Sequence, residues 1–337
     1  METALYAPGL GYYEQPHAPG RAGDYFTSVS VGPLFGQLLA FQFAQWLESA
    51  LPGGKVQIVE AGAHDGRLAA DILGWLERRR PDLLARLEYC LLDPSPARRR
   101  WQEQTLRPWS AQTVWMDDIA AVGNSQVCGI IFSNEFLDAL PIHRLAWNAS
   151  AGDWREWRVD ATEERFVWRM GEISAEAAKG LPRVPPELAQ VLPDGFILEL
   201  SPLAAEWWKA AAKALRRGKL LTLDYGAADG GLRPDRAQGT LRAFARHNVC
   251  TDVLANPGTQ DLTADVNFSA LEEAGHAAGL RTEGRWRQAR FLTQIVTQTH
   301  LQPEAFEIWN QKNVRQFQTL THPEHLGWRF QALVQSH

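Results

Sequence analysis

Residues 56–66 read Val-Gln-Ile-Val-Glu-Ala-Gly-Ala-His-Asp-Gly, and this stretch decides the fold class. The apolar run over 56–61 predicts a short buried β-strand, and Gly62 and Gly66 bracket the turn that follows it. Apolar residues at helical spacing come next, over 68–76. A strand, a glycine turn and a helix in this order open a βαβ unit and predict a mainly parallel sheet.

The alternation of strands and helices continues on both sides of this turn. One helix is predicted over 33–50, before the first strand, and another over 96–106. Further short apolar runs predict strands at 87–92, 111–115 and 127–133. Because such alternation is typical of parallel sheets covered by helices, we expect an α/β fold with a Rossmann-like sheet.

Changes in this pattern divide the chain. Short alternating segments rich in Trp and Arg, such as 154–159, predict an inserted, mostly β subdomain. The α/β pattern then returns, with strands expected at 220–223, 280–286 and 291–297. The predicted organisation is an N-terminal arm and helix (1–50), the first part of the core (51–141), the insert (142–200), the second part of the core (201–300) with a long loop (227–265), and a C-terminal helical segment (301–337).

Composition limits the class of protein. A net charge of −5 argues against a general nucleic-acid binder. No apolar run is long enough to span a membrane, and the N-terminus has no secretory-signal pattern. Three cysteines without a Cys-x-x-Cys pair fit a reducing compartment, so we expect a cytoplasmic location. No spacing of His, Cys and carboxylate residues indicates a metal site, and no pattern indicates an oligomeric state.

The turn after the first strand also bears on the ligand, because open α/β sheets bind ligands at the carboxyl ends of their strands. A dinucleotide needs Gly-x-Gly-x-x-Gly, whose second glycine lets pyrophosphate touch the backbone, and His64 occupies that position. S-adenosylmethionine (SAM) has no pyrophosphate. It needs a donor-rich turn for its methionine end and a carboxylate for its ribose, which Asp93 supplies at the second strand end. The predicted cofactor-binding residues are Glu60, Gly62, His64, Gly66, Asp93, Asp117, Asp118, Asn134 and Thr27.

Motifs spread over nearly the whole chain add a resemblance to a known family. In chain order they are Met1-Glu2-x-Ala4-Leu5-Tyr6-x-Pro8-x-x-Gly11-Tyr12-Tyr13, Gly23-Asp24-Tyr25-Phe26-Thr27-Ser28, Leu34-Phe35-Gly36, Glu60-x-Gly62-x-x-x-Gly66-x-Leu68-x-x-Asp71, Asn134-Glu135-Phe136-x-Asp138-Ala139-Leu140-Pro141, Asp224-Tyr225-Gly226, Asp261-Leu262-Thr263-x-Asp265-Val266-x-Phe268, Gln288-x-x-Phe291-Leu292 and Gly327-x-x-Phe330. Together they resemble the MidA-like SAM-dependent methyltransferases, which include a mitochondrial respiratory complex I assembly methyltransferase. The string over 134–141 is the most specific of them.

The resemblance implies a class I SAM methyltransferase fold with a family-specific insertion. It also implies methylation of a protein arginine, since the mitochondrial relative is understood to dimethylate an arginine of a complex I subunit. The chain departs from the family pattern at three positions. The family commonly has glycine where His64 stands, and glutamate where Asp93 and Gln37 stand.

Glu135 and Asp138, just past the fourth predicted strand, are the predicted catalytic residues. A guanidinium offers five donors in a fixed fork, which a carboxylate can bind bidentately while it disperses the developing charge. The alternative for Asp138 is bracing of the loop before Pro141. Tyr225 and Asp24 are the predicted substrate-binding residues. Asp24 and Thr27 could close over the ligands, or instead cap the helix that follows.

We therefore predict a SAM-dependent methyltransferase for a protein arginine, with a role in respiratory complex assembly. The implied partner is a protein substrate, for which the resemblance suggests a complex I subunit. Two alternatives stay open: a small-molecule methyltransferase, and a non-catalytic SAM-binding assembly factor marked by His64. The turn disfavours an NAD-linked oxidoreductase.

Overall fold

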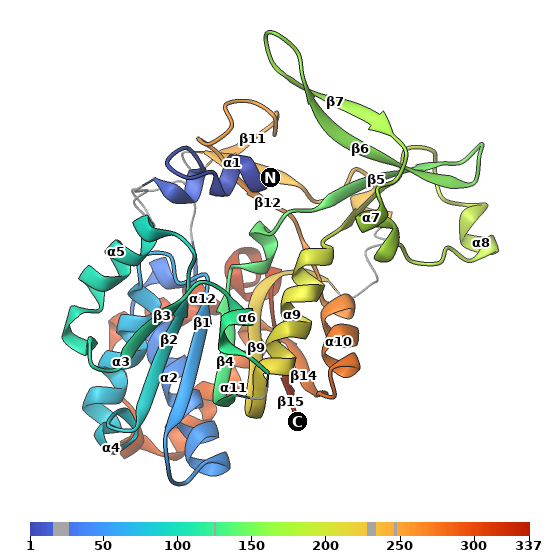
Figure 1. The fold of residues 1–337 in the computed structure, drawn as a ribbon. Helices are drawn as coiled ribbons and strands as arrows, with labels where there is room; N and C mark the ends of the chain where they lie inside the picture. The colour runs from blue at the N-terminus through green and yellow to red at the C-terminus, as the bar shows by residue number, and fades with distance from the viewer. Residues whose placement is uncertain (16–26, 125, 228–233, 246–247) are drawn as a thin grey trace.

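The main sheet runs through the centre of the molecule (Figure 1). A computed structural model of the chain describes residues 1–15, 27–124, 126–227, 234–245 and 248–337. The strands lie in the order β14-β15-β9-β4-β1-β2-β3, and β13 (Val266–Asn267) pairs with the end of β9. The bounds of the other strands are β1 (Val56–Ala61), β2 (Leu87–Leu92), β3 (Thr113–Met116), β4 (Val127–Asn134), β9 (Leu215–Ala227), β14 (Arg281–Arg287) and β15 (Phe330–Ser336).

Strands β3, β2, β1, β4 and β9 are parallel, as the alternation of strands and helices predicts. The exception is β15, which lies between β9 and β14 and is antiparallel to both. The expected α/β class with a Rossmann-like sheet is confirmed.

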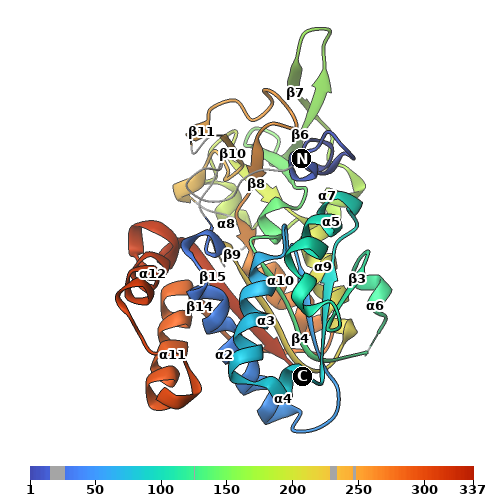
Figure 2. The same ribbon diagram turned by 90° about the vertical axis from the view of Figure 1, so that its left-hand side faces the viewer.

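Helices cover both faces of the sheet because each central strand is apolar on both faces. In β1, Ile58 packs into one core cluster and Val59 into the other, as the two-residue period of a strand requires. The first cluster lies under α2 (Leu34–Ala50), α3 (Arg67–Arg79), α11 (Gln288–Leu301) and α12 (Gln311–Thr321), which Figure 2 shows together. The second lies under α6 (Ile119–Val122), α9 (Pro202–Ala214) and α10 (Phe268–Ala277).

The chain order of the strands creates a switch point beside β1. From β1 the chain moves outward through β2 to β3, and then returns to place β4 on the other side of β1. Connections on either side of the switch leave in opposite directions, so a crevice opens at the carboxyl ends of β1 and β4. Ala61 and Asn134 are the last residues of these two strands.

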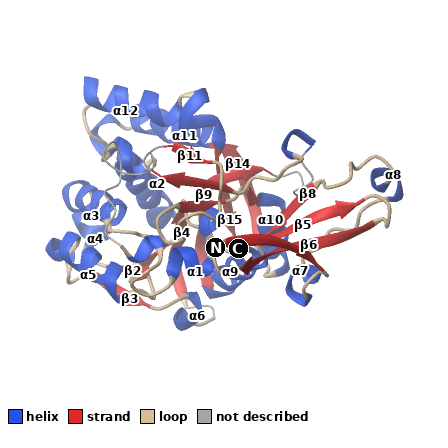
Figure 3. Ribbon diagram, turned by 90° about the horizontal axis from the view of Figure 1, so that it is seen from above, coloured by secondary structure: helices blue, strands red, loops and turns tan. Residues whose placement is uncertain are grey.

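Two smaller sheets stand above the strand ends. The insert forms the antiparallel sheet β7-β6-β5-β8, which lies to one side of the main body when seen from above (Figure 3). Its strands are β5 (His143–Asn148), β6 (Asp153–Ala161), β7 (Phe166–Gly171) and β8 (Ile197–Leu200). The other small sheet has the order β11-β10-β12, with β10 (Arg242–Ala245), β11 (Asn248–Cys250) and β12 (Asp261–Thr263).

The N-terminal arm, residues 1–15, packs against this second sheet. It contains α1 (Glu2–Tyr6) and a 3₁₀ turn (Tyr12–Glu14). Leu5 and Tyr12 of the arm share a small core cluster with Ala243 of β10 and Leu262 of β12. The arm and this sheet together form a roof over the strand ends.

Three elements differ from the sequence-based expectation. The expected strand over 291–297 lies inside α11, where Phe291, Leu292 and Ile295 all pack into the core at helical spacing. The C-terminal segment, expected to be helical, includes strand β15. The region 227–265, expected to be a loop, contains β10, β11 and β12. Among the described residues, no helix is long and apolar enough to cross a membrane.

Candidate active site

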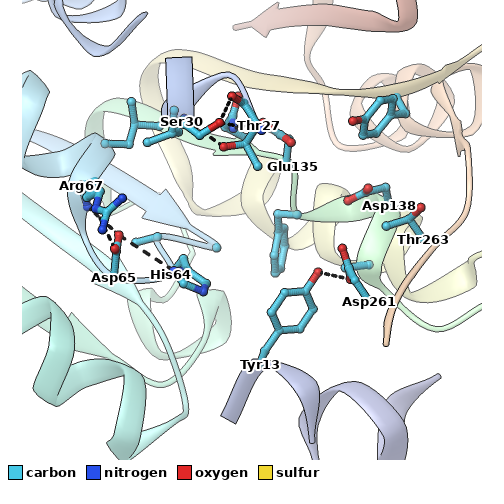
Figure 4. A pocket seen from close by; sticks show the side chains of 18 of the residues that line it. Tyr13, Thr27, Ser30, His64, Asp65, Arg67, Glu135, Asp138, Asp261 and Thr263 are labelled. Carbon is cyan, nitrogen blue, oxygen red and sulfur yellow. Dashed lines mark hydrogen bonds and ion pairs between the residues drawn. The ribbon is translucent and has the colours of Figure 1, made fainter. Parts of the chain in front are cut away.

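A cavity of about 550 Å³ opens at the switch point, under the roof (Figure 4). Its walls come from the ends of β1, β2 and β4, from the arm, from β10 and β12, and from residues 324–329. Most of the residues predicted for the site line it: Thr27, Glu60, Gly62, His64, Asp93, Asn134, Glu135, Asp138 and Tyr225.

The turn after β1 is left-handed at three positions. Gly62, His64 and Gly66 have φ angles of 77°, 48° and 82°. A Cβ atom on Gly62 would lie 2.9 Å from the Cβ of Phe136, so only glycine fits there. His64 carries the strain of a side chain in this conformation, and its carbonyl accepts a hydrogen bond from Nε2 of Gln102 at 3.0 Å. Gly66 is the N-cap residue of α3 and is not among the residues that line the cavity.

Glu60 faces the cavity from the end of β1. Its carboxyl is buried, and Oε2 accepts a hydrogen bond from the Tyr89 hydroxyl at 2.6 Å. Burial raises the pKa of Glu60 to about 7, so a cationic or hydroxyl-bearing ligand nearby would decide its charge at neutral pH.

Asp93 lies at the end of β2 as predicted, but its oxygens already accept hydrogen bonds from the protein. Arg98 Nε lies 3.0 and 2.9 Å from the two oxygens, and Nε2 of Gln102 donates to Oδ2 at 2.8 Å. The backbone N–H of Ser95 donates to Oδ1 at 2.9 Å. Arg98 also binds Oε1 of Glu14 at 2.8 Å, so a buried ion network joins the arm to the end of β2.

Glu135 is held in a left-handed conformation, with φ of 51°, just after β4. Its Oε1 accepts hydrogen bonds from the backbone N–H of Ser28 at 3.0 Å and from Nδ2 of Asn134 at 3.1 Å. Desolvation in the cavity wall, reinforced by the nearby charges of Asp224 and Asp261, raises the pKa of Glu135 to about 8. Beside it, Oδ1 of Asn134 is buried and has no hydrogen-bond partner among the described residues.

Asp138 lines the cavity together with Glu135, and Asp224 fixes the backbone of the segment that carries it. Oδ2 of Asp224 accepts hydrogen bonds from the backbone N–H groups of three successive residues, of which the Leu137 bond is 2.9 Å long. Burial raises the pKa of Asp138 well above its usual range, and the charges of Asp224 and Asp261 raise it further. A bound cation would therefore be favoured here.

Sequence reasoning assigned no role to Asp261, Tyr13 or Arg98, which also line the cavity. The Tyr13 hydroxyl donates to Oδ1 of Asp261 at 2.7 Å (Figure 4). Tyr13 and Asp261 each belong to a motif quoted above, which was the available signal. We call the end of the cavity lined by Glu135, Asp138 and Asp261 the acidic end.

Besides Gly66, the structure places two predicted residues, Asp117 and Asp118, away from the cavity lining. The Asp117 side chain is 77% exposed and pairs with Arg99 at 2.5 Å. Asp118 caps α6 by accepting the N–H of Ala121 at 3.0 Å. Both follow β3, which lies at the edge of the sheet, away from the switch point. Asp24 lies outside the described residues. Within the described part of the chain, no three His, Cys, Asp or Glu side chains are grouped to hold a metal ion.

The strand order, with a cavity at its switch point, is that of a Rossmann-like protein, a class whose ligands bind at the carboxyl ends of the strands. A family model described as "Putative S-adenosyl-L-methionine-dependent methyltransferase" matches residues 38–285. The chain belongs to this family. The predicted MidA-like resemblance, the methyltransferase activity and SAM as cofactor are thereby confirmed.

Similar proteins span almost the whole chain. The mitochondrial protein arginine methyltransferase NDUFAF7 of Rattus norvegicus is 30% identical over 369 residues, covering 98% of this chain and 78% of the relative. Its homolog in Drosophila melanogaster is 27% identical over 370 residues, covering 99% and 79%. A crystal structure from Burkholderia thailandensis with S-adenosyl-homocysteine bound has a TM-score of 0.83 and 30% identity, covering 100% of this chain and 86% of that one.

These relatives correct one expectation. The cysteine content led us to expect a cytoplasmic location, whereas the curated relatives are named as mitochondrial proteins. A reducing compartment explains unpaired cysteines, but it does not distinguish the cytoplasm from other reducing locations.

The cavity fits SAM on its own geometry. The turn at Gly62 lets a ligand approach the backbone beside the start of α3, and the N-terminal end of a helix suits a carboxylate. Asn134 and Glu60 both line the cavity, and their acceptors suit an ammonium or hydroxyl group: the Glu60 carboxyl and Oδ1 of Asn134, which has no hydrogen-bond partner in the described part of the chain.

Proposed function

We propose that this protein methylates an arginine side chain of a protein substrate, with Glu135 as the group that binds the acceptor guanidinium. The names of the curated relatives support a protein arginine substrate. The observation that carries the proposal is the setting of Glu135, whose Oε1 is held by Ser28 and Asn134 while the side chain lines the cavity. Oε2 has no hydrogen-bond partner among the described residues and is the oxygen offered to the acceptor.

The acidic end suits a guanidinium better than a neutral acceptor. Buried carboxyls of raised pKa gain most from a cation that ionises them and pairs with them. A guanidinium stays charged under all physiological conditions and can donate to more than one carboxylate at once. A neutral hydroxyl would leave Glu135 and Asp138 protonated and would gain no ion pair with them.

The roles of the protein groups follow from this arrangement. When bound, SAM supplies an electrophilic methyl group on its sulfonium. The turn at Gly62, together with Glu60 and Asn134, would hold the cofactor, and Asp93 is the predicted ribose partner. Glu135 orients the acceptor nitrogen, and its Oε2, once the paired guanidinium has ionised the carboxyl, can accept the proton that this nitrogen loses. Asp138 stabilises the guanidinium charge, and Tyr225 borders its pocket.

The finer identity of the substrate is also a proposal. The resemblance to the MidA-like family makes a subunit of respiratory complex I the first protein to assay, and respiratory complex assembly the expected role. The test incubates the purified protein with methyl-labelled SAM and with extract from cells that lack this protein. Mass spectrometry then locates the labelled residues. Labelled protein arginine supports the proposal. Label found only on small metabolites, or no label at all, would overturn the proposal.

A further inference from the structure

Helix α5 (Pro96–Thr105) turns a polar face toward the end of β2. Its buried residues are Arg98 and Gln102, which stand one helical turn apart. A helix that packs on a core ordinarily buries apolar side chains. These two side chains instead donate hydrogen bonds to the Asp93 carboxylate. The buried face of α5 therefore serves Asp93 rather than a hydrophobic cluster.

Gln102 also joins Asp93 to the turn after β1. Its side chain is fully buried, and Nε2 donates to the carbonyl oxygen of His64 at 3.0 Å and to Oδ2 of Asp93 at 2.8 Å. A Cβ atom on Gly66 would lie 3.4 Å from Cα of Gln102, so α5 packs directly against the turn. One amide group thus holds the glycine turn and the end of β2 at a fixed separation.

Trp115, in β3, fixes the orientation of this amide. Its Nε1 donates to Oε1 of Gln102 at 2.9 Å. An indole N–H can only donate and a backbone carbonyl can only accept, so the amide has a single orientation in which all three bonds form. A buried polar network that is fully satisfied is rigid. Strand β3 therefore contributes to the site through Trp115, whereas Asp117 and Asp118 lie away from the cavity lining.

We propose that Gln102 is a positioning residue for the cofactor, which sets the separation between the turn at Gly62 and Asp93. These two parts are the proposed partners of the methionine end and the ribose of SAM. Gln102 is not among the residues that line the cavity, so it acts through His64 and Asp93. Without the amide, two buried acceptors lose a donor and the groups that hold one ligand shift apart. The inference goes beyond the proposed function, because it concerns the cofactor and applies to any acceptor.

Gln335, on β15, offers a matched control. It is also fully buried, and its Oε1 accepts a hydrogen bond from Nε1 of Trp208 at 2.7 Å. Its Nε2 donates to the carbonyl of Glu272 at 3.1 Å and to the hydroxyl oxygen of Thr282 at 3.0 Å. Gln335 makes the same number of bonds as Gln102 but is not among the residues that line the cavity or contact the turn. Substitution by methionine removes these bonds in either residue with little change of shape.

The experiment measures S-adenosyl-homocysteine binding to the full chain by calorimetry. Gln102→Met should weaken binding by about 10-fold to 100-fold and raise KM for SAM in proportion. The rate of methyl transfer to cell extract at saturating SAM should change by less than about threefold, since the acceptor site is untouched. Gln335→Met should lose comparable stability but keep its affinity within about twofold of the wild type.

A milder pair of variants, Trp115→Phe and Trp208→Phe, carries the test if Gln102→Met does not fold. Each removes one indole donor, and Trp115→Phe alone should weaken binding, by about 3-fold to 10-fold. Unchanged affinity in folded Gln102→Met, or in Trp115→Phe where the former does not fold, would overturn the inference.

Two other results would also overturn it. Equal losses of affinity in both members of a pair would show that the amide supports only the fold. A lower rate at saturating SAM with an unchanged KM would place the effect on the acceptor or the chemistry. Failure of the arginine proposal would leave these binding measurements unaffected, because S-adenosyl-homocysteine binds without an acceptor.

Discussion

The backbone N–H of Ser28 donates a hydrogen bond to Oε1 of Glu135 at 3.0 Å, which joins the segment before α2 to the end of β4. The hydroxyl of Ser28 donates in turn to Oε1 of Gln288 at 3.2 Å, at the start of α11. The Glu135 carboxyl, the proposed acceptor-binding group, is therefore oriented by a segment distant in sequence and fixed to the core. Such support leaves Glu135 little freedom to reorient when a substrate arrives.

Glu135→Gln keeps the shape of this side chain and removes its charge. Turnover on arginine should fall by about 10²-fold to 10³-fold, the loss seen when one preorganised electrostatic group is removed. Affinity for S-adenosyl-homocysteine should barely change, because the proposal assigns the carboxylate to the acceptor and not to the cofactor. Methyl transfer from labelled SAM and calorimetry measure the two quantities. Full-rate arginine labelling by the variant would show that Glu135 does not bind the acceptor.

The raised pKa of Glu135 makes a prediction about stability and pH. Between about 4.5, the ordinary pKa of a glutamate, and about 8, the folded state holds a proton that the unfolded state has lost. The contribution of Glu135 to the free energy of unfolding should therefore fall as pH rises through this window. Denaturant melts of wild type and Glu135→Gln at pH 5 and pH 8 should show the variant gaining roughly 3–4 kcal/mol relative to the wild type. Glu163→Gln, at an exposed position, should show no such gain. A pH-independent difference between wild type and Glu135→Gln would contradict the shifted pKa.

Asp93→Ala should weaken S-adenosyl-homocysteine binding by roughly 1.5–3 kcal/mol if this carboxylate binds the ribose. It should also lower the free energy of unfolding by about 3 kcal/mol, since Arg98 loses one of its two buried partners. Calorimetry on the folded variant separates the two effects. Asp117→Asn is the matched control at the end of β3, and its affinity should stay within about twofold of the wild type. Unchanged affinity in Asp93→Ala would remove Asp93 from the cofactor site.

His64→Gly tests whether the histidine marks a loss of activity. Glycine relieves the left-handed conformation, so the free energy of unfolding should change by no more than about 1 kcal/mol. S-adenosyl-homocysteine affinity should be equal or weaker, because the site accommodates His64. Asn256→Gly relieves a comparable φ of 44° outside the cavity lining and controls for the backbone effect. A large gain in affinity for His64→Gly alone would instead favour a degenerate, non-catalytic cofactor site.

The strand ends near the switch point could be predicted because the sequence features that mark them lie within the strands and the residues just after them. The apolar runs of β1 and β4, each followed by polar residues, place Glu60 and Glu135 at the crevice without any knowledge of distant contacts. Asp117 follows a strand with the same pattern. Only the strand order of the folded sheet shows that β3 is an edge strand, so that its end lies away from the switch point.

Other features depend on contacts that no local pattern encodes. Tyr13 and Asp261 meet across 248 residues, through packing of the arm on β12. The glutamines of β15 interrupt its apolar pattern, so the sequence did not predict this strand. One of them, Gln335, is buried, and its Oε1 accepts a hydrogen bond from Nε1 of Trp208 at 2.7 Å. The segment over 291–297 is rich in β-branched residues, yet packing on α2 and α12 makes it a helix, as tertiary context often overrides local preference.

The position of β15 has a consequence for biosynthesis. Every other strand of the main sheet is translated before it, yet β15 fills the space between β9 and β14. Until residues 330–336 have emerged from the ribosome, the nascent chain exposes the unpaired edge of β9, and such an edge invites pairing with other chains. The sheet is thus completed only after translation of the segments that carry Glu60, Glu135 and Asp138.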